Sequence, residues 1–158
     1  MSGITYGLAD PATVAALPGL ELLQRMIDGE VPAAPIAEPL DFLLVEVAHG
    51  QAVFEGRPSA RLLNPLGTVH GGWALTLIDS AAGCAVHTTL PAGGGYTTLE
   101  TKVNFTRAIR PDGQAVRCTG VVLNAGRQIA TAEAKLVAAD GTLLAHGTST
   151  LMIFGARG

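Results

Sequence analysis

One acidic side chain, Asp79, interrupts an otherwise apolar stretch that is long enough to form a helix. From Gly71 to Val86 it is the one charged residue, and most of its neighbours are Leu, Ile and Ala. A carboxylate in such surroundings is costly to remove from water unless it is paired or used in chemistry. Asp79 is therefore a candidate catalytic group. The alternative interpretation places it on a solvent-facing stripe with Thr76, Ser80 and Gly83.

A glycine-rich segment, NPLGTVHGG, runs from Asn64 to Gly72 and leads directly into this stretch. Free backbone N–H groups at the start of a helix, reinforced by the helix dipole, can hold an anion or polarise a carbonyl. Two consecutive glycines, Gly71 and Gly72, allow a ligand to approach closely because neither has a Cβ. An ordinary glycine-rich helix start would show the same pattern.

The elements that must position these residues can be predicted from periodicity and turn chemistry. Residues 73–90 are rich in Ala and Leu and poor in turn residues, which predicts one long central helix. Strands are predicted over 42–49, 51–58, 96–107, 114–123, 127–137 and 142–154. Tight turns between the later strands favour an antiparallel meander. The predicted fold class is α+β, with a single long helix against a curved antiparallel sheet of about six strands.

Within the strand over 96–107, alternation predicts two faces. Leu99, Thr101, Val103 and Phe105 are expected on one face, and Thr98, Glu100, Lys102 and Asn104 on the other.

The first 39 residues differ from the rest and are predicted to form a helical extension and a Pro-rich connector, ahead of a domain over 40–158. Residues 11–17 predict a short helical turn and residues 20–28 an amphipathic helix, with a break at Pro18. Residues 30–39 carry three prolines, which predicts an extended connector.

The composition excludes several classes of protein. Of the 158 residues, 48% are hydrophobic and 15% charged, which favours a buried subunit interface. The net charge of -3 and scattered basic residues argue against nucleic-acid binding. No segment resembles a membrane span or a signal peptide, so a cytoplasmic location is expected. The two cysteines and four histidines have neither disulfide nor metal-ligand spacing, so no metal site is predicted.

The glycine-rich segment and the acid nine residues after its His resemble the hotdog-fold acyl-CoA thioesterases of the phenylacetic-acid-pathway (PaaI-like) type. The segments TTLETKVNFTRAIRPDG and GRQIATAEAKLVAADGTLLAHGTST agree, so the resemblance spans roughly Leu40 to Phe154. It implies a hotdog fold and hydrolysis of an acyl-CoA to free acid and CoA. Aryl or arylacetyl groups are favoured and medium-chain acyl groups come next. No separate cofactor is implied, because coenzyme A is part of the substrate.

The resemblance also assigns roles to residues. Asp79 would be the nucleophile or the general base for water, and the Gly71 N–H the oxyanion donor. Asn64 would orient the attacking water or the thioester. His70 would help to position the thioester, although a helix-start histidine bonded to backbone is an equal alternative. One branch of the family carries Asp at the acid position and a second branch carries Glu, so Asp79 favours the first branch.

Further residues are implied to bind the substrate. The family often places a hydroxyl beside the carboxylate, and either Thr97 or Thr98 matches it, with Thr98 favoured. Candidate substrate-binding residues are Gly72 and, for the phosphates of coenzyme A, Arg107, Arg110 and Arg127. Ordinary surface arginines would explain the last three equally well.

The family's site lies at a dimer interface, where the glycine loop of one subunit faces the acid of the other. A homodimer or a homotetramer built from two dimers is therefore expected. Two alternatives remain: a non-catalytic acyl-CoA-binding module, and a hotdog enoyl hydratase or dehydratase, which pairs an Asp with a His a few residues later. A pure binder has no need of Asp79, and His87 follows Asp79 by eight residues, which fits the hydratase pattern less well.

Overall fold

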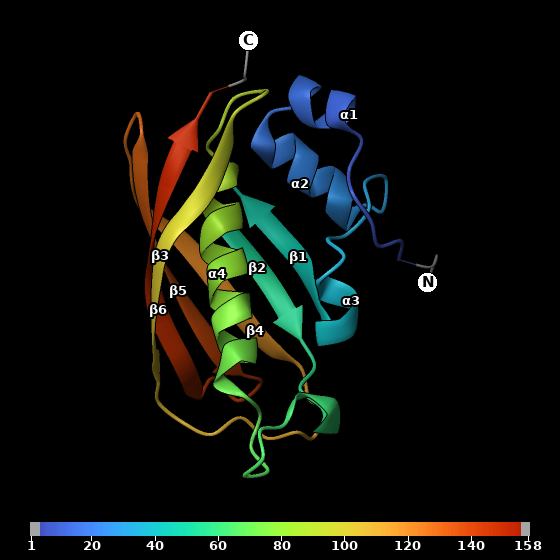
Figure 1. Cartoon of the computed structure of the whole chain (residues 1–158), viewed down its shortest axis with the longest axis vertical. Helices are drawn as coiled ribbons and strands as arrows, with labels where there is room; N and C mark the ends of the chain where they lie inside the picture. The colour runs from blue at the N-terminus through green and yellow to red at the C-terminus, as the bar shows by residue number, and fades with distance from the viewer. Residues whose placement is uncertain (1–3, 156–158) are drawn as a thin grey trace.

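A six-stranded antiparallel sheet curves around one long helix in the computed structural model, which describes residues 4–155 (Figure 1). The strands lie in the order β1-β2-β4-β5-β6-β3. Their bounds are β1 Phe42–Ala48, β2 Gln51–Gly56, β3 Gly95–Phe105, β4 Val116–Ala125, β5 Ile129–Ala138 and β6 Leu143–Phe154. The predicted α+β hotdog fold is confirmed.

Helix α4 (Gly71–His87) is the central helix, and it begins two residues earlier and ends three residues earlier than the predicted range 73–90. The earlier start follows from His70, whose side chain caps the helix by accepting the Gly72 N–H. The helix packs closely on the sheet because the facing residues are small. Ala74, Ala81 and Ala85 are fully buried, and Gly120 on β4 lies directly beneath the backbone of Ala81.

The sheet order corrects one prediction, that the last four strands form a meander. Strands β4, β5 and β6 do so, but β3 pairs with β6 and forms an edge of the sheet. The segment between β3 and β4 is a crossing connection, anchored by the buried Ile109 and by a bond from the Gly113 N–H to the Pro58 carbonyl. A hairpin normally needs only two to five loop residues, and this connection is longer.

A β-bulge in β3 corrects the predicted faces of that strand. Thr98 pairs with Leu151 and Thr101 with Ser149, so Leu99 is the extra residue. Leu151 and Ser149 are buried on the helix side of β6. Thr98 and Thr101 therefore share the inward face, whereas Leu99 is 54% exposed.

The N-terminal extension lies beside β1, along one side of α4 (Figure 1). It contains α1 (Pro11–Ala16), α2 (Gly19–Ile27) and α3 (Ala37–Leu40). The prediction of an extended connector is wrong at its end, because residues 37–40 form the single turn of α3. No helix in residues 4–155 is long and apolar enough to cross a membrane.

Candidate active site

Asp79 lies near the middle of α4, on the side of the helix next to the edge strand β3, and it is half-buried. Its Oδ1 accepts two hydrogen bonds, from the hydroxyls of Thr98 and Thr101, each 3.0 Å long. The sequence resemblance placed Thr98 beside the carboxylate, and the structure adds Thr101. Two neutral donors on one oxygen fix the carboxylate in place and leave the second oxygen without a partner among the described residues.

A third hydroxyl stands behind this pair. The Oγ of Ser149 lies 3.0 Å from the Oγ of Thr101 and 3.1 Å from the Glu100 carbonyl oxygen, and Ser149 is 1% exposed. Thr101 donates its only hydroxyl proton to Asp79, so its oxygen can accept from Ser149 but cannot donate to it. Ser149 has one proton to share between the Thr101 oxygen and the Glu100 carbonyl, and either bond keeps Ser149 beside the Thr101 hydroxyl.

Asn64 organises the glycine-rich loop through its own side chain. Its Oδ1 accepts the N–H groups of Leu66 (2.9 Å) and Thr68 (3.3 Å), and its Nδ2 donates to the Thr68 hydroxyl (2.8 Å). Gly67, within this turn, has φ +84, a backbone angle that favours glycine. Within one chain, Asn64 therefore holds the loop in shape and is not brought to Asp79.

The start of α4 presents one free amide. The Nδ1 of His70 accepts the Gly72 N–H at 2.8 Å, so this histidine serves as the helix cap and Gly72 does not offer its N–H to a ligand. The Gly71 N–H has no acceptor among residues 4–155. The ring of Phe105 lies beside Gly71, at 3.1 Å from the place where a Cβ would be.

A cavity of about 420 Å3 adjoins Asp79 on the side facing β1 and the N-terminal extension. Ser80, Cys84 and Tyr96 line it together with Asp79, and most of the other lining side chains are apolar. The carboxylate thus meets a largely apolar space that could hold the apolar part of a ligand.

Cys84 is the other side chain near Asp79 that could act as a nucleophile. Burial raises the pKa of its thiol to about 12, and the charge of Asp79 adds to the rise. Burial also raises the pKa of the neighbouring Tyr96 hydroxyl. Both groups stay protonated at neutral pH, so Cys84 does not supply a thiolate and Asp79 remains the candidate reactive group of this site.

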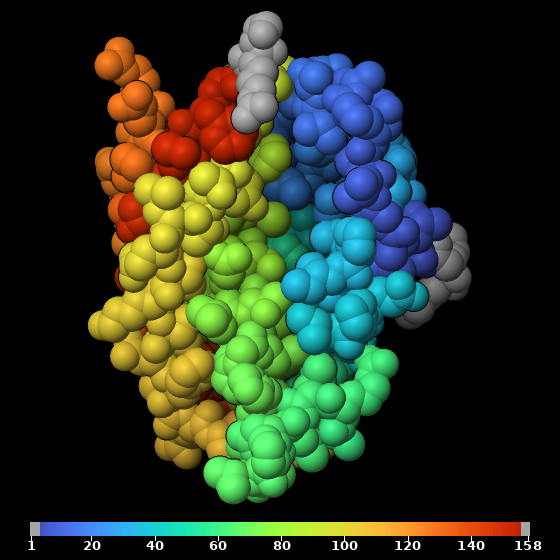
Figure 2. Space-filling view, viewed as in Figure 1, coloured from blue at the N-terminus to red at the C-terminus, as the bar shows by residue number. Residues whose placement is uncertain are grey.

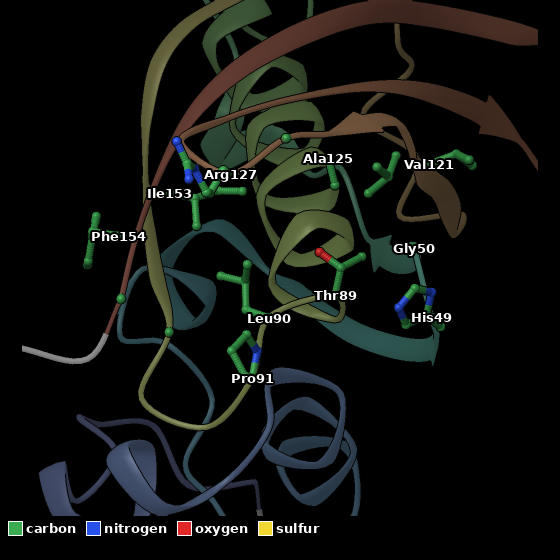
Figure 3. A pocket seen from close by; sticks show the side chains of 14 residues that line it. His49, Gly50, Thr89, Leu90, Pro91, Val121, Ala125, Arg127, Ile153 and Phe154 are labelled. Carbon is green, nitrogen blue, oxygen red and sulfur yellow. The ribbon is translucent and has the colours of Figure 1, made fainter.

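The three candidate arginines do not lie together. Arg107 and Arg110 are exposed on the connection that follows Phe105, at the Gly71 end of α4. Arg127 lines a second hollow, of about 780 Å3, at the opposite end, with Leu90 and Pro91 facing it across the hollow (Figure 3). Since α4 has 17 residues, about 25 Å of helix separates the two ends.

No group of three or more His, Cys, Asp or Glu side chains that could hold a metal ion exists within the described residues. The arrangement that the structure does offer is a carboxylate held by hydroxyls, an apolar cavity beside it and a free helix-start amide.

The site contains four residues that the sequence reasoning did not assign to it: Thr101, Ser149, Tyr96 and Phe105. Thr101 lies three residues after Thr98, a spacing that an alternating strand would send to opposite faces. Ser149 comes from a strand whose pairing with β3 was not predicted. Only the T-x-x-T spacing, read as a bulged strand, could have indicated Thr101.

Comparisons with known proteins agree on one family. The thioesterase superfamily matches residues 66–145. A protein of Halobacterium salinarum that bears the name of an esterase is 32% identical over 96 residues. That match covers 56% of this chain and 62% of the relative, so the chain spans less than two thirds of that protein's length.

Solved structures extend the comparison over more of the chain. A variant of the phenylacetic acid degradation protein PaaI from Thermus thermophilus is 31% identical and covers 75% of this chain and 97% of its own, with a TM-score of 0.68. A phenylacetic acid degradation-related protein of Ralstonia eutropha is 27% identical and covers 83% of this chain and 98% of its own, with a TM-score of 0.74.

Proposed function

The chain belongs to the thioesterase superfamily, and we propose that it hydrolyses the thioester bond of an acyl-CoA, with aryl or arylacetyl groups preferred and medium-chain groups next. The observation that carries this proposal is the carboxylate of Asp79, held by Thr98 and Thr101 beside an apolar cavity. A carboxylate held in one orientation beside such a cavity supports attack on an acyl thioester bound there.

Two routes give the same products. In the first, Asp79 attacks the carbonyl carbon and the CoA thiolate leaves and takes a proton; water then hydrolyses the acyl-aspartyl anhydride to the free acid. In the second, Asp79 removes a proton from a water molecule while the oxygen of that water attacks the carbonyl carbon. The proton then passes from Asp79 to the leaving sulfur. In both, one water is consumed and one C–S bond is broken. The fixed Oδ1 and unpaired Oδ2 of Asp79 suit either route.

Negative charge develops on the carbonyl oxygen during attack, and the free Gly71 N–H is the proposed donor to it. In one chain, however, Asp79 follows Gly71 by eight residues, or about 12 Å along the helix. One thioester carbonyl can accept a hydrogen bond from an amide and be attacked by a carboxylate only if the amide and the carboxylate lie within about 7 Å of each other. A water between the carboxylate and the carbonyl carbon adds about 3 Å to that limit. This separation supports a site shared between two subunits.

The proposed assembly is a homodimer, or a homotetramer of two dimers, in which the Gly71 amide of one subunit serves the Asp79 of another. The uncovered side of α4 supports it, because Leu75, one turn before Asp79, is 39% exposed there. In such a site Asn64 and His70 would act by shaping the loop that presents Gly71 and Gly72.

Arg107 and Arg110 are the proposed contacts for the CoA phosphates, because they lie at the Gly71 end of α4, where the thioester would be held. Arg127, at the other end of the helix, could reach the same phosphates only from a neighbouring subunit.

A turnover assay with a free-thiol reagent tests the proposal. We expect the protein to release CoA from phenylacetyl-CoA or octanoyl-CoA, and Asp79→Asn to lower kcat by about 100-fold or more while the fold and the assembly persist. Binding of acyl-CoA without thiol release would identify a binding module. Loss of the enoyl absorbance from an enoyl-CoA, without thiol release, would identify a hydratase.

A further inference from the structure

We propose that the N-terminal extension forms one wall of the acyl-binding cavity, and that Met26 and Ile27 on α2 limit the length of the acyl group that the enzyme accepts. This inference rests on the proposed thioesterase function. It assigns a specificity role to a segment that lies entirely outside the part of the chain matched by the thioesterase superfamily, residues 66–145.

The cavity beside Asp79 has three walls. One is α4, with Asp79, Ser80 and Cys84, and a second is the sheet, with Phe42 and Phe54 on β1 and β2. The third belongs to the extension and is the largest by number of lining residues. Figure 2 shows the face that carries α4, where a hollow lies between the helix (green) and the N-terminal segment (blue and cyan).

Residues of α2 and of the connector after it make up the third wall. Leu23, Met26 and Ile27 contribute from α2, and Val31 and Ala33 from the connector. Leu23, Val31 and Ala33 are buried and belong to the core of the fold. Met26 and Ile27 are only half-buried, so they can change size with the least effect on that core.

The extension is fixed in place, as a specificity wall must be. The Gly19 N–H donates to the Leu90 carbonyl, and a Cβ at Gly19 would overlap His87, so the start of α2 lies against the end of α4. At the other end, the indole N–H of Trp73 donates to the Leu40 carbonyl at 2.8 Å. Both attachments join the extension to the helix that carries Asp79, so the wall and the carboxylate keep a constant separation.

The lining defines the chemical class of the acyl group. Among the described residues that line this cavity there is no Lys, Arg or His, and the two charged ones, Asp28 and Asp79, are acidic. An acyl group that ends in a second carboxylate would meet repulsion with no counter-charge. The cavity therefore suits an uncharged, largely apolar acyl group.

The size of the cavity sets an upper limit on that group. Its volume of about 420 Å3 is in the range typical of small-molecule pockets. A water-sized group needs about 30 Å3, so the space holds on the order of a dozen such groups, the thioester carbonyl included. An arylalkanoyl group or a medium-chain alkanoyl group fits within this volume, whereas the last methylenes of a long-chain fatty acyl group would extend beyond it.

Paired substitutions at Met26 test the inference because they change the wall in opposite directions. Met26→Trp should shift the best substrate toward shorter chains and Met26→Ala toward longer ones, measured as kcat/KM for straight-chain acyl-CoAs from acetyl to dodecanoyl. Each methylene of the acyl chain that is no longer buried in the cavity should lower kcat/KM about fourfold. Gln24→Trp and Gln24→Ala are matched controls, since Gln24 is exposed on the same helix and bonds only to Asp28.

The readout is the ratio of rates between acyl groups in one preparation, so it does not depend on how much of a variant folds. Ile27→Ala replaces Met26→Ala if the latter is not obtained. Identical chain-length profiles in wild type and both Met26 variants, or equal shifts in the Gln24 controls, would overturn the inference.

Failure of the proposed function is recognised separately. If the wild type releases no thiol from any acyl-CoA, affinities for acyl-CoA thioethers, which cannot be hydrolysed, take the place of rates. If the affinity shifts with chain length in opposite directions in the two Met26 variants, α2 limits the length of the bound acyl group even though the protein does not hydrolyse it. Unchanged affinities, or no binding at all, would overturn the inference.

Discussion

Thr98 and Thr101 donate to the same oxygen of Asp79, although Thr101 comes three residues after Thr98 and a regular strand would place the two side chains on opposite faces. The bulge at Leu99 makes this possible, because it takes one residue out of the alternation and brings both hydroxyls to the face of α4. The carboxylate thus depends on a local irregularity of the strand as much as on the threonines themselves.

We predict that Thr98→Ala and Thr101→Ala each lower kcat by about tenfold, and that the double variant loses more than either. Without the hydroxyls, the Asp79 carboxylate is no longer held in one orientation, so the effect should be on kcat more than on KM. Thr97→Ala is the matched control, since Thr97 is exposed on the same strand. A Thr97 variant as impaired as the other two would show that the effect comes from the strand rather than from the hydroxyls.

A shared site predicts that two inactive variants restore each other. Asp79→Ala lacks the carboxylate, while Gly71→Val obstructs the amide and needs only a small movement of the exposed Phe105 ring. Random reassembly makes about half of the dimers hybrid, each with one intact site, so about a quarter of wild-type activity should return. Subunit exchange should be verified by mass spectrometry of tagged chains. Verified hybrids without activity would mean that each chain carries its own complete site.

Close packing between α4 and the sheet predicts a large stability effect at Gly120. A Cβ there would overlap the backbone carbonyl of Ala81, which cannot move without the helix. We expect Gly120→Ala to lower the free energy of unfolding by about 1–3 kcal/mol, measured from denaturant midpoints. Gly155→Ala is the control, because no atom of the described residues beyond its chain neighbour lies within 4 Å of the added Cβ, and it should change stability by less than about 0.5 kcal/mol. Equal midpoints for the two variants would contradict the observed packing.

Burial lowers the pKa of His87, which predicts a loss of stability in acid. In the unfolded chain this imidazole titrates near about 6.5, so below that pH the unfolded state binds the proton more readily than the folded state. Stability is then full above the unfolded pKa and falls as pH drops toward the folded one. Unfolding free energies at pH 7.5 and pH 5.5 should differ less in His87→Gln than in wild type. The same difference in both proteins would assign the acid sensitivity to other groups.

The sequence predicted the helices and strands better than it predicted which strands pair with each other. Apolar periodicity was enough for the central helix and for all six strands, since those patterns are local. The pairing of β3 with β6 depends on contacts between distant segments, and a long connection that crosses the fold reads in the sequence like any other turn region. The predicted meander was wrong for that reason.

The candidate site was foreseen to a similar extent. Asp79 stood out as an isolated charge, and the structure places Thr98 beside it. Thr101 and Ser149 could not be placed, because the first needs the bulge and the second needs the strand order. The wall of the cavity formed by α2 was also beyond the sequence, since apolar residues on an amphipathic helix face a core and a ligand with the same pattern.

The edge position of β3 also has a consequence in time. The Thr101–Ser149 contact joins residues 48 apart, and Ser149 lies on β6, the last strand of the sheet in chain order. During synthesis from the N-terminus, Asp79 and both threonines emerge before the strand against which β3 must align. A nascent chain without β6 therefore has the Asp79 carboxylate but not the bulged register that orients it, and the arrangement of Asp79 with its two threonines is completed only after the sheet has formed.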